Sequence, residues 1–221
     1  MAVPADAQPD PAGDGHLSVL DPVTGCAYDF WQARRVGSGW SASWANSLSL
    51  NGTGVFAGGL SARGSGFALA AGLVWPQELR DGAINHALVF AFPNTAAGGP
   101  VAPASKSDGT STGSSAIPMG ARIQLDPSLD IDRLGLRPYE RTIARALQEY
   151  GAFVGDTGGS PTVYAANPIS QPAGAYDGLV PAGASVRLDR IPLDRFRVLA
   201  TGPQQSNRYF LNGDGCARMI R

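Results

Sequence analysis

Short apolar runs, separated by loops rich in Gly, Ser and Pro, form the main pattern of hydrophobic and polar positions along this chain. The clearest two are Val89-Phe90-Ala91-Phe92 and Ile123-Gln124-Leu125-Asp126. Each follows a mixed segment, residues 84–88 and residues 118–122, that places isolated polar residues at its boundary. Runs of this length between turn signals are typical of strands. The pattern predicts a β-sandwich with polar side chains on one face or on the rim.

Further strands are predicted towards both ends of the chain. Residues 16–33 alternate between apolar and polar positions around Asp21-Pro22-Val23-Thr24-Gly25, which predicts a β-hairpin with a tight turn. A period of two across residues 40–50 suits another strand better than a helix. Two closing strands are expected at 186–188 and 196–199.

Helical signals are confined to two places. Apolar residues recur at helical spacing between Pro138 and Tyr150, so we expect one long helix over 138–150 that packs one face onto the sheets. Residues 76–82 begin with Pro and end with Gly, which predicts one short helical turn. Residues 157–183 are polar and irregular, and a loop of that length in a compact domain is usually functional or disordered.

The composition favours one mostly β domain. The 221 residues include 29 Gly and 17 Pro, so turns must be numerous. Sandwiches of this length often form one domain, which we expect to span residues 14–221. Residues 1–13 lack the regions of a signal peptide and are typical of a disordered linker. The predicted fold is an antiparallel β-sandwich of jelly-roll type with one packed α-helix, at about 138–150.

Charge and cysteine content narrow the partners. The formal net charge is −1 and no basic cluster occurs, which argues against nucleic acid. No apolar stretch reaches the ~20 residues that a bilayer requires. Cys26 and Cys216 either form a disulfide that pins the C-terminal segment or stay unpaired. The cysteines and histidines lack zinc spacing, so no cofactor is predicted, although Asp126, Asp130 and Asp132 could offer oxygens to a structural calcium ion without EF-hand spacing.

A series of short motifs runs in order through residues 14–199. It includes His-Leu-x-Val (16–19), Tyr-Asp-Phe-Trp (28–31), Ile-Asn-His-Ala-Leu (84–88) and Pro-Met-Gly-Ala-Arg (118–122). This series resembles a widespread family of secreted bacterial single-domain proteins of unassigned activity, and the resemblance implies secretion. Members of that family tend to carry Ser-Ala-Asp where this chain has Ser61-Ala62-Arg63, which weakens any role near residue 63. More loosely, the layout resembles β-jelly-roll carbohydrate-active proteins.

Two kinds of polysaccharide cleavage suit the residues available. A lyase acting on a uronic acid needs a cation at the carboxylate and a base for the C5 proton, which Arg122 and either His86 or Tyr28 could supply. A glycoside hydrolase needs two carboxyl groups that flank the scissile bond, but no pair here has a diagnostic spacing. The candidate catalytic residues are His86, Arg122, Tyr28, Asp108 and Asp29.

Further residues are candidates for substrate binding. Exposed tryptophans stack on sugar rings, whereas buried ones build the core. The candidate binding residues are Trp31, Trp44, His16, Glu78 and Asp156. Each candidate also has a plain structural explanation: the aromatic residues could be core, His86 could be hydrogen-bonded inside, and Arg122 could pair with Asp108 or Asp126.

The sequence therefore predicts a secreted carbohydrate-active protein that cleaves a polysaccharide in a groove on its concave sheet, either as a lyase or as a glycoside hydrolase. The alternative is a non-catalytic carbohydrate-binding or cell-surface module, since no catalytic spacing is diagnostic. A structural jelly roll that assembles through its faces would need a large exposed apolar patch. The substrate and the oligomeric state stay open.

Overall fold

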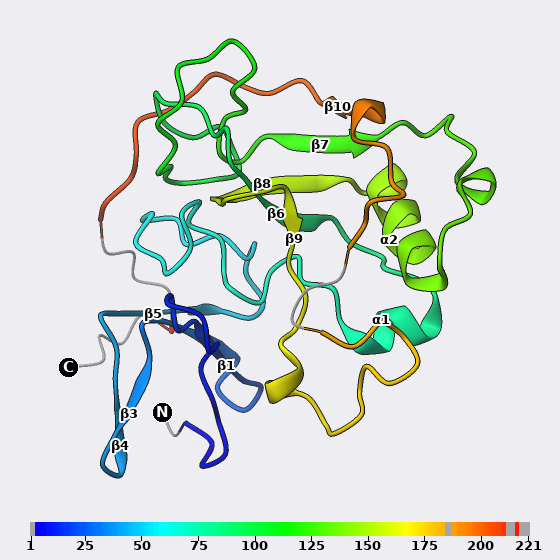
Figure 1. Ribbon diagram of the computed structural model, residues 1–221. Helices are drawn as coiled ribbons and strands as arrows, with labels where there is room; N and C mark the ends of the chain where they lie inside the picture. The colour runs from blue at the N-terminus through cyan, green and yellow to red at the C-terminus, as the bar shows by residue number, and fades with distance from the viewer. Residues whose placement is uncertain (1–2, 184–186, 211–214, 217–221) are drawn as a thin grey trace.

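The architecture is mostly β. A computed structural model describes residues 3–183, 187–210 and 215–216 (Figure 1). Within these residues ten strands form three sheets, with two α-helices and three short 3-10 helices beside them. The predicted mostly β class is confirmed. The larger sheet fills the upper half of Figure 1, and the two smaller sheets lie below it towards the left.

The larger sheet has five strands in the order β10-β7-β8-β6-β9. β6 and β8 run parallel, while the other neighbouring pairs are antiparallel. The larger sheet is therefore mixed. Jelly rolls are antiparallel throughout, so this sheet does not establish jelly-roll connectivity. The strands are β6 (Leu88–Phe92), β7 (Arg122–Leu125), β8 (Ala152–Thr157), β9 (Thr162–Val163) and β10 (Phe196–Val198).

Helix α2 (Pro138–Glu149) connects β7 to β8 and lies beside the larger sheet (Figure 1). The Glu140 carboxylate accepts a hydrogen bond of 2.7 Å from the Arg137 backbone N–H, which supports the first turn. The apolar side of the helix, which includes Ile143 and Leu147, is buried in the main core with the sheet. The helix predicted over 138–150 is confirmed, although Tyr150 follows its last helical residue.

The smaller sheet has the antiparallel order β1-β2-β5, formed by β1 (Leu17–Asp21), β2 (Cys26–Trp31) and β5 (Trp44–Ser49). The predicted hairpin at 16–33 is therefore confirmed. The single strand predicted over 40–50 is wrong. Its first residues belong to β4 (Gly39–Ser41), which pairs with β3 (Arg34–Val36) in a separate ribbon, and the rest form β5. A period of two continues through a change of strand partner, so periodicity did not reveal the break.

The remaining elements are short. Helix α1 (Pro76–Asp81) confirms the predicted helical turn, and Gly82 ends it in the left-handed conformation at φ 71°. The 3-10 helices are η1 (Ile131–Leu134), η2 (Pro168–Ser170) and η3 (Leu193–Arg195). Residues 157–183 are largely irregular, as predicted, but they contain β9 and η2. The strand predicted at 196–199 is confirmed as β10, whereas 187–188 form no strand and residue 186 lies outside the described residues.

Cys216 and residues 3–13 are held by contacts with the rest of the domain. Cys26 and Cys216 form a disulfide, which settles the alternative in favour of the bridge. Residues 3–13 contain no helix or strand. They contact the domain through Asp10, whose carboxylate accepts a hydrogen bond of 2.9 Å from Asn167. Their predicted character as a disordered linker stays a prediction.

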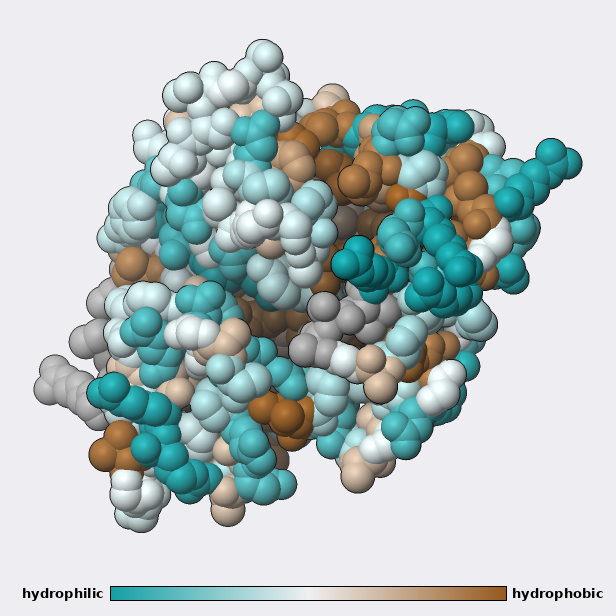
Figure 2. Space-filling view, in the orientation of Figure 1, coloured by the Kyte–Doolittle hydropathy of each residue, from teal (hydrophilic) through white to brown (hydrophobic). Residues whose placement is uncertain are grey.

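Apolar surface gathers over the region of β7 and β10 (Figure 2). β10 is an edge strand, and Val198 on it and Leu193 just before it are 48% and 70% exposed. β10 and β9 are the two edge strands of the larger sheet, and this surface lies at the β10 edge.

Candidate functional site

One face of the smaller sheet carries polar and aromatic residues in rows. The register places Ser18, Asp29 and Asn46 side by side across β1, β2 and β5. The next row of the same face contains Trp31 opposite Trp44. Side chains alternate between faces along a strand, so these rows share what we call the inner face of the sheet, which is covered by the loop 54–71.

Asp29 is the fully buried centre of this face. Its carboxylate accepts hydrogen bonds of 2.7 Å from the Ser18 hydroxyl and 2.8 Å from the Leu69 backbone N–H. Burial raises the pKa of Asp29, and these two hydrogen bonds together with the charge of Arg63 oppose that rise. Asp29 therefore joins the sheet to the loop 54–71.

Arg63, whose charge acts on Asp29, is 3% exposed. Its guanidinium donates hydrogen bonds of 3.0–3.2 Å to the backbone carbonyls of Ala68, Leu69 and Ala71, so it folds the loop around itself. The guanidinium also lies 4.9 Å from the centre of the Tyr164 ring. A buried cation needs partners of this kind because desolvation would otherwise be too costly.

Two further carboxylates converge on Gly64, the next residue of the loop. A Cβ atom placed on Gly64 would lie 2.6 Å from Asp108 Oδ2 and 2.8 Å from Asp156 Oδ1. Asp108 is exposed and accepts a hydrogen bond of 2.6 Å from the Thr157 hydroxyl, while Asp156 is half-buried at the end of β8. The two carboxylates form what we call the carboxylate pair.

Burial and charge set the protonation of this region. Burial raises the pKa of Asp156, Arg63 opposes the rise, and the charge of Asp108 adds to it. Burial also raises the pKa of Tyr164 to about 12, with a further contribution from Asp156. Burial lowers the pKa of Lys106, whose ammonium donates to the Ser61 carbonyl at 3.1 Å. Asp156 thus holds its proton more tightly than an ordinary aspartate does.

The structure brings six of the ten predicted site residues into this region. Asp29, Trp31 and Trp44 lie on the inner face. His16 lies one residue before β1 and two residues before Ser18, so the alternation of side chains along the strand places it on the same face. His16 is an electrostatic neighbour of both Asp29 and Asp156. The six residues are His16, Asp29, Trp31, Trp44, Asp108 and Asp156.

The other four candidates have separate partners. His86 Nε2 lies 2.8 Å from Glu78 Oε1, and Glu78 also accepts from the Trp75 backbone N–H at the start of α1. Arg122 Nε donates to the Tyr150 carbonyl at 2.5 Å. Tyr28 lies on the outer face of the smaller sheet, packed against an apolar cluster that includes Phe30. His86, Arg122 and Tyr28 therefore do not form one group among the described contacts.

Sequence reasoning missed Arg63, Tyr164 and Lys106. Arg63 was set aside because the resembling family tends to carry an acidic residue there, yet it lies at the centre of the cluster. One signal was available, because Arg63 is the only charged residue in the glycine-rich run 52–72. Small residues on both sides allow the backbone to wrap around a single cation. Tyr164 and Lys106 gave no signal, because their role depends on tertiary contacts.

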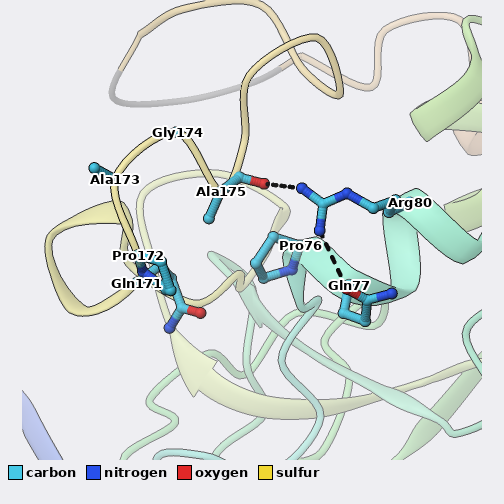
Figure 3. A pocket seen from close by; sticks show the side chains of 8 residues that line it. All are labelled: Pro76, Gln77, Arg80, Gln171, Pro172, Ala173, Gly174 and Ala175. Atoms are coloured by element: carbon cyan, nitrogen blue, oxygen red, sulfur yellow. Dashed lines mark hydrogen bonds between the residues drawn. The ribbon is translucent and has the colours of Figure 1, made fainter.

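A surface depression lies elsewhere, between α1 and residues 171–175 (Figure 3). Arg80 crosses it and donates hydrogen bonds of 3.1 Å to both the Ala175 carbonyl and the Gln77 side chain. Its lining contains no carboxylate and no histidine, so it lacks groups for acid–base chemistry. We therefore take the carboxylate pair and the inner face as the candidate site.

Two negative findings concern the part of the chain that the structure describes. There, no three His, Cys, Asp or Glu side chains are grouped so as to hold a metal ion. No helix there is both long and apolar enough to cross a bilayer. Comparison of the chain with protein-family models, with curated proteins and with solved structures finds no match.

Proposed function

We propose that this protein cleaves a polysaccharide by hydrolysis at the carboxylate pair. The observation that carries the proposal is the approach of Asp108 and Asp156 to one point beside Gly64. Their facing oxygens are each within 2.8 Å of that point, so they lie closer together than the ~6.5–9.5 Å used by inverting glycosidases. The geometry favours a retaining hydrolase, in which one carboxylate attacks the sugar directly.

The two carboxylates have different environments that suit two roles. Asp156, whose pKa burial raises, is the general acid and gives its proton to the glycosidic oxygen as the bond to C1 breaks. Asp108, exposed and held by Thr157, is the nucleophile and forms the bond to C1. Water then attacks C1, loses its proton to Asp156 and releases Asp108, which restores both groups.

The lyase alternative is less well supported. Its three sequence candidates, Arg122, His86 and Tyr28, have separate partners. Within the cluster, Arg63 is buried and donates to three backbone carbonyls, and a pKa of about 12 makes Tyr164 a poor base near neutral pH. A non-catalytic binding module is favoured by one observation, the half-buried and exposed tryptophans Trp44 and Trp31 on the inner face.

The same proposal includes secretion, the jelly-roll type of the fold and the resemblance to a family of secreted proteins. The disulfide is compatible with an extracellular protein, because such bonds persist in oxidising compartments, and secretion follows as our hypothesis. The jelly-roll assignment is proposed for the antiparallel strands, and the parallel pairing of β6 with β8 departs from it. The resemblance to a family of secreted bacterial proteins likewise stays a proposal.

The test is an activity screen on neutral and uronic-acid polysaccharides that follows reducing ends and the ultraviolet absorbance of unsaturated products. A hydrolase releases reducing ends without that absorbance. We expect Asp108→Asn and Asp156→Asn each to lower kcat by about 10²–10⁴-fold. The matched control is Asp194→Asn, at an exposed carboxylate of η3.

The outcomes separate the three candidate functions. Unsaturated products that disappear in a His86→Ala and Arg122→Ala double variant would establish the lyase instead. Silence on every polymer, with retained binding to one of them, would favour the binding module. Circular dichroism on each variant confirms that a loss of activity is not a loss of fold.

A further inference from the structure

The inner face of the smaller sheet contains buried polar atoms without partners. Among the described residues, Asn46 Nδ2, Asn46 Oδ1, Trp44 Nε1 and His16 Nε2 are shielded from solvent and form no hydrogen bond. Asn46 is 9% exposed as a whole residue. Buried polar groups in native proteins are nearly always paired, and leaving one unpaired costs about 1–3 kcal/mol. Four such atoms on neighbouring positions need an explanation.

Their positions show that they belong together. Asn46 and Trp44 are two residues apart on β5, so their side chains share the inner face. Trp44 lies opposite Trp31, and Asn46 lies opposite Asp29. The loop 54–71 links this group to the carboxylate pair, because its Leu69 N–H bonds Asp29 and its Gly64 lies beside Asp108 and Asp156. The unpaired atoms thus lie along one face, between exposed Trp31 and buried Asn46.

The chemistry of these atoms selects a class of ligand. Asn46 offers one acceptor and two donors, Trp44 offers one donor, and a histidine ring nitrogen such as His16 Nε2 can donate or accept according to its tautomer. This mixture of donors and acceptors matches hydroxyl groups, each of which both donates and accepts. A carboxylate or sulfate group would instead meet the oxygens of Asp29, which lies opposite Asn46, and those of the carboxylate pair.

We infer that Asn46, Trp44 and His16 form a subsite for an uncharged, hydroxyl-rich sugar unit next to the carboxylate pair. The inference rests on the proposed carbohydrate function and specifies its substrate as a neutral polysaccharide. The unpaired atoms are closed off from solvent, so the sugar reaches them after a local opening beneath the loop 54–71. Trp31 and Trp44 supply aromatic area at the entrance.

The experiment measures affinity and stability in the same variants. Isothermal titration uses the Asp156→Asn protein, which binds substrate without turning it over, and the probes are the hexasaccharides of xylan, mannan, cellulose and arabinan, with oligogalacturonate as the charged probe. Asn46→Leu removes both unpaired amide atoms at similar volume. Trp44→Phe removes one donor and keeps a ring. Asn85→Leu, at an exposed position with no described contact, is the matched control.

A binding subsite predicts a trade-off between affinity and stability. We expect one neutral hexasaccharide to bind, Asn46→Leu to weaken it at least tenfold, and Trp44→Phe to weaken it less. We expect Asn46→Leu at the same time to raise Tm by about 2–4 °C, because it removes unpaired buried atoms. Asn85→Leu leaves affinity and Tm unchanged.

Other results would overturn the inference. If Asn46→Leu lowers Tm and leaves affinity intact, a fixed water or an internal partner satisfies Asn46 and no subsite exists. Tighter binding of oligogalacturonate than of every neutral probe refutes the ligand class, and binding of no probe refutes the subsite. If a neutral probe binds through Asn46 while the wild-type protein cleaves no polymer, the subsite stands and the proposed hydrolysis fails.

Discussion

Arg63 shows how one enclosed side chain can organise a whole loop. The chain from Ala68 to Ala71 turns its carbonyls inwards onto the guanidinium, and Asp29 and Asp156 supply opposite charge nearby. These contacts satisfy a cation that would otherwise be unstable in the interior. A structural role is therefore sufficient to explain why Arg63 is buried, and its effect on chemistry passes through Asp156.

The first prediction concerns this arginine. We expect Arg63→Met to lower the free energy of unfolding by about 3–5 kcal/mol, because it leaves the carbonyls unbonded and two carboxylates without compensation. Arg63→Lys should lie between the wild type and Arg63→Met, since a lysine keeps the charge but cannot reach three carbonyls with a planar fork. Urea unfolding followed by tryptophan fluorescence measures both.

The control for Arg63 is an arginine of the same chain that is exposed. Arg34→Met, in the ribbon strand β3, should change the unfolding free energy by less than about 0.5 kcal/mol. A loss at Arg63→Met no larger than this control would show that the buried guanidinium does not hold the loop.

The second prediction concerns the carboxylate pair and needs no substrate. The charge of Asp108 raises the pKa of Asp156, so Asp108→Asn should lower that pKa. Carboxyl-carbon NMR during a pH titration reads it directly, and Asp194→Asn should leave it unchanged. An Asp156 pKa that does not respond to Asp108→Asn would mean that the two carboxylates are not close in solution.

The same shift has a consequence for stability. A raised folded-state pKa means that Asp156 keeps its proton to higher pH in the folded chain than in the unfolded chain. Its contribution to stability is therefore most favourable at low pH, and it declines as the pH rises from the ordinary aspartate value through the raised one. Asp156→Asn should remove that part of the pH dependence of unfolding.

At the scale of elements, the C-terminal strap, residues 203–210, is the clearest example of structure built from backbone contacts. Gln205 N–H bonds the Pro100 carbonyl at 2.8 Å, and Arg208 N–H bonds the Ser105 carbonyl at 3.0 Å. Asn207 bonds Ser107, the neighbour of Asp108. The strap therefore fixes the loop that presents one member of the carboxylate pair.

The third prediction tests the close approach of this strap. Gly59 has φ +73° and a Cβ there would meet the Arg208 carbonyl, whereas Gly82 has φ +71° and no atom within 4 Å. Gly82→Ala should cost about 1–2 kcal/mol from backbone strain alone. Gly59→Ala should cost about 1–3 kcal/mol more because the strap must move, and proteolysis should then cut the strap first. Equal losses in the two variants would show that the strap does not press on Gly59.

Element prediction succeeded where local chemistry determines the outcome. The hairpin around Asp21-Pro22-Val23-Thr24-Gly25, the helix begun by Pro138 and the turn ended by Gly82 each depend on neighbouring residues. The strand over 40–50 failed because its two halves have different partners. Strand order is set by contacts distant in sequence, so the parallel pairing of β6 with β8 could not be inferred from periodicity.

The candidate site, like the fold, was predictable from the sequence only in part. Carboxylates and tryptophans were recognisable by residue type, but their grouping was not, since Asp29, Asp108 and Asp156 come from three distant segments. Arg122 and His86 attracted attention through sharp motif boundaries and instead bind a carbonyl and a capping glutamate. Motif boundaries thus marked strand starts, whereas the buried charges Asp29 and Arg63 lie inside β2 and in the glycine-rich loop.

For the whole molecule, the disulfide is the link that joins the ends of the chain. Cys26 and Cys216 are separated by 190 residues, and the Cys216 carbonyl accepts a hydrogen bond from Ser47 on β5. Closing a loop of this length restricts the unfolded chain by an amount that the loop-entropy model places at about 5 kcal/mol. The bridge thus holds Cys216 against the smaller sheet.

The fourth prediction follows from this arrangement. The double variant Cys26→Ser with Cys216→Ser should lose up to about 5 kcal/mol of unfolding free energy, and the reduced wild type should match it. Reductant added to the double variant should change nothing further, which separates the bridge from general effects of the reagent. A loss below about 1 kcal/mol would show that the unfolded chain gains little freedom when the bridge is cut.

Hydrogen exchange measures which amides lose protection when the bridge is removed. Because the bridge anchors the chain beyond the strap at Cys216, the amides of residues 203–210 should exchange faster in the double variant, while those of β6 and β8 keep their protection. The Ser107 contact with Asn207 should open with the strap, so that Asp108 loses its support. The rate of polysaccharide cleavage should therefore fall by a larger factor than the folded fraction of the protein does. Uniformly faster exchange would instead mean that the bridge stabilises the whole domain without preference for the strap.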